Sequence, residues 1–326
     1  MKSKGKPPFF SVVIPVYNKE SHIARSINSV LNQTFKDFEL IVICDPSTDN
    51  SNGEVDKFDD PRIQVLYRDE PGPGGYAARN LGIKQAKSEW IAFLDADDEW
   101  YSNYLELAHE RAKKFKTNII CFSYEVIGAK NHQDRLISAC IDKDMVSSRV
   151  EVLNILKDKD VFHANVILIK KYVLEKIGSF PSGKKYKRGG DVDTWLRAVL
   201  AEENVLFCPE VTSFYNVENS GVISDKKNAL SPQPVVDTVS EVLPSIEDEK
   251  LNKYLKKLSN RKSISRIYDL KLIGEFKLVE LKKIYFSELE LKQFLRMALI
   301  TVLPVSVYDL CRNNLRFLYS VNCKKE

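Results

Sequence analysis

The stretch WIAFLDADD, residues 90–98, places an uninterrupted apolar run directly before three carboxylates. Consecutive apolar residues of this kind are typical of a short strand that is buried on both faces of a sheet. Asp95, Asp97 and Asp98 would then lie where this strand ends. The stretch therefore predicts a buried strand with a cluster of acidic side chains at its carboxyl end.

The chain around this stretch alternates apolar runs with segments of helical periodicity. Such alternation predicts an α/β fold, in which a mostly parallel sheet carries helices on both faces. The first helix is expected to begin near Ile23, with Ser21 as its N-cap. The predicted strands cover residues 9–16, 38–43, 62–67, 90–94 and 119–124, and later helices cover residues 76–85, 104–115 and 191–201.

Acidic residues follow two of these predicted strands. Asp45 follows the second strand, and Asp95 and Asp97 follow the fourth. Open α/β sheets bind ligands outside the carboxyl ends of their strands, so we expect these three carboxylates to meet at one edge. Mg²⁺ and Mn²⁺ prefer oxygen ligands and commonly take one or two carboxylates together with substrate phosphates. The Asp-x-Asp pattern suits such a site, although a solvated acidic turn has the same pattern.

Three further features are compatible with chemistry at this edge. The loop PGPGG at 71–75 precedes a helix start, which favours an anion, but a flexible turn has the same composition. Arg79 lies one turn into that helix. Asp191 and Asp193 begin another predicted helix, either as a cap or as a general base. The histidines, His163 among them, have no recognisable partners in the sequence.

Composition and charge argue against several classes of function. The 326 residues carry a net charge of +4, which gives no reason to expect a nucleic-acid partner. The six cysteines are irregularly spaced, which argues against a disulfide scaffold or a zinc site. P-loop and G-x-S-x-G patterns are absent. Without a signal peptide or an apolar run of about 20 residues, we expect a cytoplasmic protein, in solution or on the inner face of a membrane.

The C-terminal third differs in composition from the rest. We expect a catalytic domain over residues 1–225, a linker rich in Ser, Pro and Asn over 226–245, and a helical region over 246–326. Residues 297–308 carry no charge and are flanked by Lys and Arg, which suits peripheral contact with a membrane. A helix packed against the catalytic domain is an equally good interpretation of the same residues.

Five blocks of the chain resemble, in their order and spacing, the inverting family-two glycosyltransferases with the GT-A fold. The similarity extends over roughly residues 9–224. The five blocks are residues 11–18, 26–34 together with 38–42, 45–49, 77–83 and 91–98, and residues 173–180 and 190–197 resemble the family's acceptor-side segment.

The resemblance implies roles in binding the donor for residues near the first two strands. Pro15, Tyr17 and Asp45 would bind the nucleotide base, with Tyr17 stacking on it and Asp45 accepting a hydrogen bond from a ring N–H. Asn18 belongs to the same donor-binding block. Arg79 would help to organise the donor site.

The resemblance also implies a metal site and a general base. Asp95 would contact the ribose, and Asp97, assisted by Asp98, would hold Mn²⁺ or Mg²⁺ against the diphosphate. Asp191 would deprotonate the acceptor hydroxyl. The metal and the base would then act on opposite sides of one displacement.

The sequence departs from the family pattern at three places. The turn after the second strand has Cys44 in place of a polar residue and Pro46 in place of glycine. Gly190 precedes Asp191 where the family usually has Glu. Residues 216–219 read NVEN where a basic residue or a histidine is often seen. These departures affect the donor loop, the residue before the candidate base and a possible phosphate contact, whereas Asp45, Asp95, Asp97 and Asp191 match the family pattern.

The resemblance implies transfer of a sugar from a nucleotide-sugar donor, a UDP-sugar by expectation, to a saccharide or a lipid-linked saccharide. Capsule, O-antigen or exopolysaccharide synthesis in a bacterium would be the setting. The alternatives are a metal-dependent nucleotidyltransferase and a non-catalytic module that binds nucleotide sugars. The first should have a loop rich in Gly and Lys near the first strand, which is absent, and the presence of Asp97 and Asp191 argues against the second.

Overall fold

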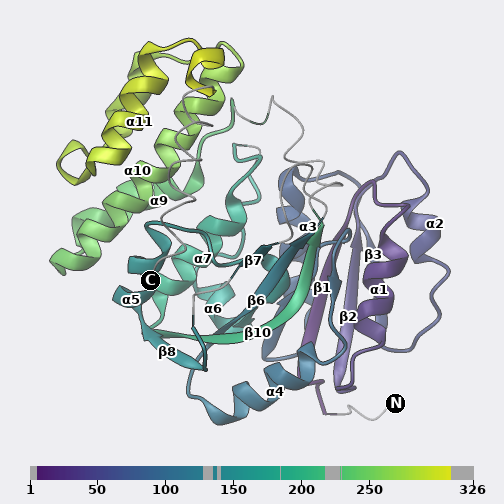
Figure 1. The fold of residues 1–326 in the computed structure, drawn as a ribbon. Helices are drawn as coiled ribbons and strands as arrows, with labels where there is room; N and C mark the ends of the chain where they lie inside the picture. The colour runs from purple at the N-terminus through teal and green to yellow at the C-terminus, as the bar shows by residue number, and fades with distance from the viewer. Residues whose placement is uncertain are drawn as a thin grey trace.

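The computed structural model describes residues 6–127, 135–137, 141–183, 185–216, 228 and 230–309. Within these residues, ten strands form one sheet in the order β3-β2-β1-β4-β9-β6-β10-β5, with β7 paired to β6 and β8 paired to β10 (Figure 1). Helices flank the sheet, and three C-terminal helices lie beside it. The predicted α/β class with C-terminal helices is confirmed.

The first half of the sheet is parallel and brings three strand ends to one edge. Val16, the last residue of β1, pairs with Cys44 of β2, and Val13 pairs with Phe93 of β4. Apolar runs place all of β2 in the core. The strands are β1 (Phe10–Val16), β2 (Phe38–Cys44), β3 (Ile63–Tyr67), β4 (Trp90–Phe93), β5 (Glu99–Trp100), β6 (Ile119–Ile127), β7 (Arg135–Ile137), β8 (Met145–Ser148), β9 (Ile167–Lys170) and β10 (Asn204–Asn216).

The helix that follows the glycine-rich loop packs unusually close to β1. A Cβ on Gly82 would lie 2.4 Å from Cγ1 of Val13, so only glycine permits this approach. The predicted cap of the first helix is wrong: its N-cap is His22 and not Ser21, because a turn at Lys19 leads directly into the helix. The helices in this part are α1 (Ile23–Leu31), α2 (Ser51–Val55), α3 (Tyr76–Gln85), α4 (Tyr104–Lys114), α5 (Arg149–Leu156), α6 (Lys171–Lys176) and α7 (Gly190–Ala201).

Much of the segment predicted as a linker is helical and buried. Helix α9 (Pro234–Val242) contributes Val235 and Val239 to the main core, which also takes Leu255 of α10 (Glu249–Leu272). The linker prediction therefore fails for these residues, because valines at helical spacing pack against the catalytic part. Residues 217–227 lie outside the described residues, and the domain boundaries stay a prediction.

The outermost helix, α11 (Leu291–Val302), packs on the distal half of α10 through a second apolar cluster. Ile264 and Ile267 of α10 meet Met297 and Ile300 of α11 in that cluster. None of the helices in the described part of the chain has both the length and the apolar character needed to cross a bilayer.

Candidate active site

The residues predicted to bind the nucleotide base lie at the ends of β1 and β2. Tyr17 directly follows β1 and is 48% exposed, so its ring is open to stacking. Asn18 has a φ of +52°, and its Oδ1 accepts a hydrogen bond from the backbone N–H of Thr48 at 2.8 Å. Asn18 therefore joins the two loops. Pro15 lies beneath the glycine-rich loop, since a Cβ on Gly75 would lie 3.5 Å from that of Pro15.

The glycine-rich loop connects Asp45 with Arg79. Asp45 is buried, forms an ion pair with Arg68 and accepts a hydrogen bond from the backbone N–H of Gly72 at 3.2 Å. Two residues further on, the carbonyl oxygen of Gly74 accepts a hydrogen bond from Nη1 of Arg79 at 2.9 Å. The loop and Arg79 thus lie at the same sheet edge as Asp45.

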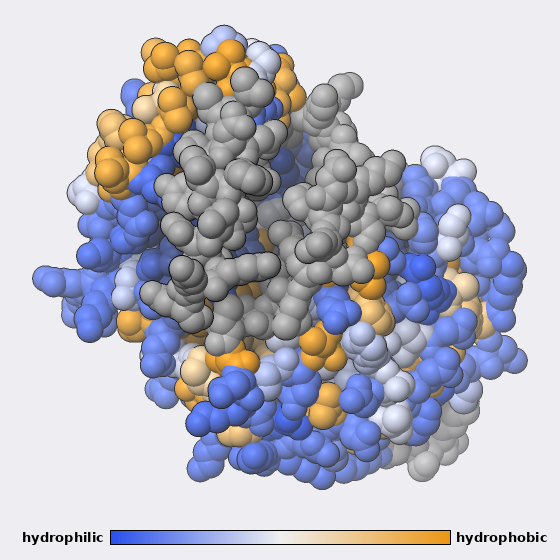
Figure 2. All heavy atoms as spheres, viewed as in Figure 1, coloured by the Kyte–Doolittle hydropathy of each residue, from blue (hydrophilic) through white to orange (hydrophobic). Residues whose placement is uncertain are grey.

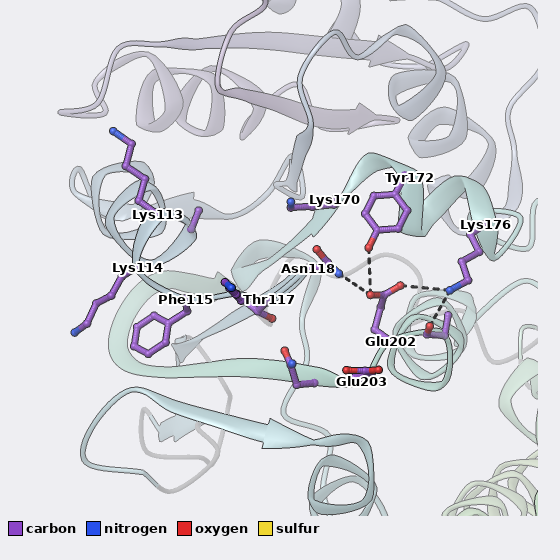
Figure 3. Close-up of a pocket in the computed structure, with 14 residues that line it drawn as sticks. Lys113, Lys114, Phe115, Thr117, Asn118, Lys170, Tyr172, Lys176, Glu202 and Glu203 are labelled. Carbon is purple, nitrogen blue, oxygen red and sulfur yellow. Dashed lines mark hydrogen bonds and ion pairs between the residues drawn. The ribbon is translucent and has the colours of Figure 1, made fainter.

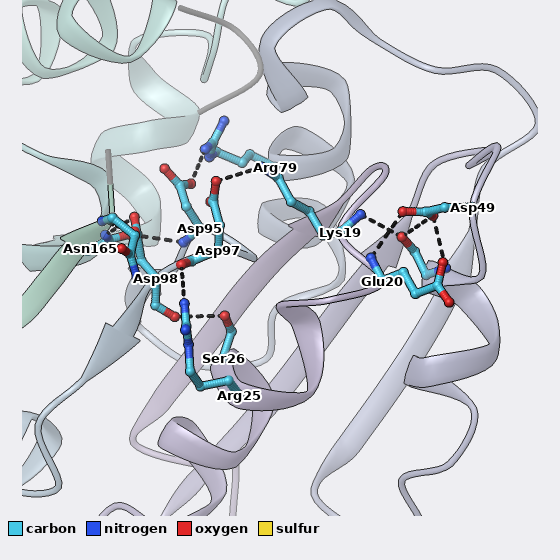
Figure 4. A network of polar contacts seen from close by, with 12 residues as sticks. Lys19, Glu20, Arg25, Ser26, Asp49, Arg79, Asp95, Asp97, Asp98 and Asn165 are labelled. Atoms are coloured by element: carbon cyan, nitrogen blue, oxygen red, sulfur yellow. Dashed lines mark hydrogen bonds and ion pairs between the residues drawn. The ribbon is translucent and has the colours of Figure 1, made fainter. Parts of the chain in front are cut away.

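Arg79 forms an ion pair with Asp95 at the start of the acidic loop (Figure 4). Burial by itself would raise the pKa of Asp95, but the charge of Arg79 outweighs it and holds that pKa below its ordinary value. Asp95 is therefore an anion with an orientation fixed by the guanidinium. The arrangement brings Asp45, the glycine-rich loop and Asp95 into one connected group.

The side chain of Asp97 forms an ion pair with Lys19 in this structure. Nζ of Lys19 lies 2.6 Å from Oδ2 of Asp97, and both side chains are partly accessible. Figure 4 shows Lys19 reaching the acidic loop from the turn after β1. Carboxylate oxygens are the ligands that Mn²⁺ and Mg²⁺ prefer, and a metal at Asp97 would take the place of the Lys19 ammonium, so the role of Asp97 as a metal ligand stays a prediction. Lys19 was not among the predicted site residues.

Asp98 differs from its two acidic neighbours because it is fully buried. Its Oδ1 accepts a hydrogen bond from the backbone N–H of Asn216 at 2.7 Å, and its Oδ2 accepts one from Nδ2 of Asn165 at 2.6 Å. Burial, with the nearby charges of Asp95 and Asp97, raises the pKa of Asp98 well above its ordinary value. These contacts make Asp98 an anchor of the loop, and its role as a metal ligand stays a prediction.

Asn165 is a centre of the site that the sequence analysis missed. Its Oδ1 accepts a hydrogen bond from the backbone N–H of Asp95 at 2.9 Å, and its carbonyl oxygen accepts one from Nε1 of Trp100 at 2.7 Å. With its bond to Asp98, this fully buried amide holds the acidic loop from both sides. Its only signal in the sequence is one amide at the start of an apolar run.

Asp191 and Asp193, the two acidic residues at the start of α7, have different surroundings. Asp193 is buried, pairs with Arg197 at 2.8 Å and accepts a hydrogen bond from Oγ1 of Thr238 at 2.5 Å. Asp191 is partly exposed and forms no hydrogen bond or ion pair with any residue that the structure describes. Its negative charge helps to raise the pKa of Arg79, so it lies on the side of the donor residues. Of the two carboxylates, Asp191 is the one available to a substrate.

The glycine before Asp191 makes room for a tyrosine. A Cβ on Gly190 would lie 2.7 Å from Cζ of Tyr76, and the backbone N–H of Gly190 donates a hydrogen bond to the Tyr76 hydroxyl at 2.9 Å. The side chain of a glutamate here would collide with that ring. The departure from the family pattern thus has a steric cause.

The loop that leads into α7 is held by the C-terminal helices. Arg188 pairs with Asp269 of α10 at 2.5 Å. Lys185 and Tyr186 both bond to Asp237 of α9 at 2.8 Å. Residues 185–189, which precede the candidate base, are therefore positioned by segments outside the sheet.

A groove of about 750 Å³ lies at the opposite edge of the sheet (Figure 3). It is lined by the residues that precede β6 and β10, at the amino ends of these strands. Glu202 in this groove is bonded to Asn118 at 2.7 Å and to Tyr172 at 3.3 Å. The groove is separate from the acidic loop and contains none of the predicted site residues.

Solved structures with a similar fold identify the architecture. The chain is similar to S. aureus TarS in complex with UDP-GlcNAc, with a TM-score of 0.71 and 19% identity over 94% of this chain and 91% of that chain. It is also similar to the mannosyltransferase PcManGT from Pyrobaculum calidifontis in complex with GDP-Man and Mn²⁺, with a TM-score of 0.55 and 17% identity over 99% and 89% of the two chains. The fold is therefore the GT-A fold of glycosyltransferases.

Sequence comparison gives the family. Residues 11–178 match the model of glycosyl transferase family 2. The chain is 32% identical over 225 residues to the Escherichia coli UDP-Glc:alpha-D-GlcNAc-diphosphoundecaprenol beta-1,3-glucosyltransferase WfgD, a match that covers 68% of this chain and 83% of WfgD. The chain belongs to glycosyl transferase family 2.

Proposed function

We propose that this glycosyltransferase moves a sugar from a nucleoside-diphosphate sugar, a UDP-sugar in the first instance, to a hydroxyl of a glycan acceptor with inversion. One observation carries the proposal: side chains suited to base binding, metal binding and proton transfer come together at a single sheet edge. These side chains are Tyr17, Asp45, Asp95, Asp97 and Asp191.

The chain's own residues divide the chemistry between two sides. Asp191 accepts the proton of the attacking hydroxyl, a role that typically contributes about a hundred- to ten-thousand-fold to the rate. Arg79 keeps Asp95 ionised and oriented on the donor side. Asp97 would hold a divalent cation, which would stabilise the charge that develops on the leaving diphosphate. A single displacement needs no covalent intermediate and inverts the anomeric carbon.

We further propose a lipid-linked saccharide as the acceptor, in the synthesis of a bacterial surface polysaccharide at the inner face of the membrane. The name of WfgD specifies an acceptor on diphosphoundecaprenol, which supports a lipid carrier here. The outward face of α11 adds a second support, because it exposes Leu291, Phe294, Leu295 and Val302. Figure 2 shows apolar side chains gathered over this part of the molecule.

Thermal shift with a panel of UDP-sugars, with and without Mn²⁺, followed by an assay of UDP release, tests the proposal. We expect one donor to raise Tm only with the metal, because a ligand that binds the folded state stabilises it. An acceptor carrying GlcNAc-diphosphate on a lipid should then increase UDP release. Absence of both effects for every donor would refute the proposal, whereas stabilisation without turnover would indicate a binding module. Release of pyrophosphate from a nucleoside triphosphate would indicate the nucleotidyltransferase.

A further inference from the structure

His163 lies between the donor side and the base side of the candidate site, and nothing above gives it a role. It immediately precedes the short helix η2 (Ala164–Val166). Its ring packs against the rings of Tyr124, at a centroid distance of 5.1 Å, and of Tyr215, at 4.6 Å. These contacts fix the plane of the imidazole.

The hydrogen bond made by one ring nitrogen determines what the other offers. Nδ1 of His163 accepts a hydrogen bond from the backbone N–H of Asn165 at 3.3 Å. Nδ1 therefore carries no hydrogen, and in the neutral ring the hydrogen is on Nε2. The ring thus presents an N–H donor.

The imidazole of His163 lies close to two acidic side chains. A ring nitrogen of His163 and carboxylate oxygens of Asp95 and Asp98 all lie within 4.8 Å of one another. Both oxygens of Asp98 already accept hydrogen bonds, and Asp95 is paired with Arg79. Among the described residues, Nε2 of His163 has no hydrogen-bond partner of its own, and the residue is partly exposed.

The charges around His163 decide which kind of group its N–H can bind. A phosphate next to the ionised Asp95 would be repelled by that carboxylate. A metal would require a lone pair on Nε2, which the bond between Nδ1 and Asn165 denies it. A neutral hydroxyl can accept from His163 and donate to a neighbouring carboxylate at the same time.

We infer that His163 is a specificity-determining residue whose Nε2–H donates a hydrogen bond to a hydroxyl of the transferred sugar. The inference rests on the proposed function, because it requires a sugar between Asp95 and Asp191. It adds a contact that distinguishes a nucleotide sugar from the free nucleotide. Sugars that differ at that hydroxyl are then discriminated by this contact.

A comparison of the affinities for a nucleotide sugar and for the bare nucleotide separates a contact with the sugar from a contact with the diphosphate or the metal. We choose His163→Phe, which keeps the ring between two tyrosines and removes the donor, and His163→Asn, which restores a donor on a shorter side chain. His109→Phe is the matched control, because His109 also packs on two rings, those of Phe9 and Phe35. Calorimetric titration with UDP-glucose, UDP-galactose and UDP, each with Mn²⁺, gives the readout.

His163→Phe should weaken binding of the preferred UDP-sugar by about three- to tenfold, as the loss of one hydrogen bond does, and leave UDP affinity unchanged. His163→Asn should recover part of the loss, and His109→Phe should match the wild type. An equal loss for UDP and the UDP-sugar, or a loss of Mn²⁺ affinity, would overturn the inference in favour of a diphosphate or metal contact. If His163→Phe bound the UDP-sugar as tightly as the wild type, the inference would be wrong and His163 would have only a packing role. If the wild type bound UDP but no UDP-sugar, the proposed function would fall first.

Discussion

At the scale of single residues, Asp191 and Asp193 lie in one turn of α7 but have different surroundings, and under the proposed function they have different roles. Asp193 is buried between Arg197 and Thr238, whereas Asp191 has no partner among the described residues and is accessible. A general base must have room for the hydroxyl that it deprotonates, and a structural carboxylate must not. The same substitution at the two positions should therefore have opposite consequences.

Asp191→Asn should lower kcat for sugar transfer by about a hundred- to ten-thousand-fold, because the amide cannot accept the proton. Donor affinity and Tm should stay near the wild-type values. Asp193→Asn is the control, and it should lower the free energy of unfolding by about 3 kcal/mol, because it breaks a buried charged pair. Steady-state kinetics and thermal unfolding of both variants check this. Full activity in Asp191→Asn would remove this residue from the mechanism.

Cys44, which departs from the family pattern, is expected to be chemically inert. It is fully buried, and burial together with the charges of Asp56 and Asp45 raises the pKa of its thiol to about 12. The thiolate is the reactive form, and an ordinary thiol ionises near pH 8.5. Raising the pH from 7 to 9 should therefore speed alkylation of accessible thiols and leave Cys44 unmodified.

Mass spectrometry of peptides after treatment with iodoacetamide measures this directly. The same peptide should react once the protein is unfolded in guanidinium, which provides the internal control. Alkylation of Cys44 in the folded protein at pH 9 would contradict the burial of this residue.

At the scale of elements, the C-terminal helices contact the loop that leads to the candidate base. They bond to residues 185–189, and α9 also reaches α7 through Thr238 and Asp193. A displacement of about 1 Å in a catalytic group can change a rate by a hundredfold. Contacts that fix this loop therefore influence the rate without touching a substrate.

Reversing the charges of the pair between the loop and α10 tests this positioning role. Arg188→Asp and Asp269→Arg should each lower kcat several-fold with little change in donor affinity, and the double variant should recover most of the rate. The cost in stability should be about 1 kcal/mol or less, since the pair is partly exposed. The control is Lys257→Asp, which breaks the pair of α10 with Glu290 at 2.6 Å, away from the loop. A failure of the double variant to recover would argue against direct positioning.

Helices and contacts are predicted from the sequence when the residues that determine them are neighbours in the chain. The bounds of α3 are predicted correctly as Tyr76–Gln85, because a glycine-rich loop marks its start. Helix α9 was missed because Ser, Pro and Asn surround its valines and suggest a linker. The contacts of Asn165 and His163 with the acidic loop were not predictable, because their partners lie about 70 positions away in the chain. The carboxylates were found because strand ends concentrate them, and their partners depend on tertiary packing.

At the scale of the whole molecule, the apolar segment near the C-terminus forms a helix, α11, with one face buried against α10 and the other exposed. Met297 and Ile300 are buried against α10, while Leu291, Phe294 and Val302 face outward at helical spacing. Lys292 and Arg296 lie beside this exposed stripe. An apolar face bordered by cations is typical of helices that lie in a membrane interface. The flanking cations beyond residue 309 lie outside the described residues.

The full chain should float with liposomes that contain anionic phospholipid, and Leu291→Ser combined with Phe294→Ser should reduce binding at least about tenfold. Each exposed side chain contributes about 1.5–3 kcal/mol when it enters an apolar phase. Point variants are preferable to removing α11, because truncation would expose the cluster on α10. Val146→Ser combined with Tyr172→Ser is the control, as both residues are similarly exposed on the catalytic part. Equal flotation of both double variants would discard the membrane contact.

The hydrogen bond between Tyr76 and Gly190 has a consequence for how the donor side and the acceptor side of the proposed mechanism are held relative to each other. One phenol links the start of α3, the helix of Arg79, to the start of α7, the helix of Asp191, so under the proposed function a single side chain helps to set the distance between the donor side and the base. The phenol and the contacts of α9 and α10 with residues 185–189 therefore hold the same end of α7, and a change in either would alter the position of Asp191.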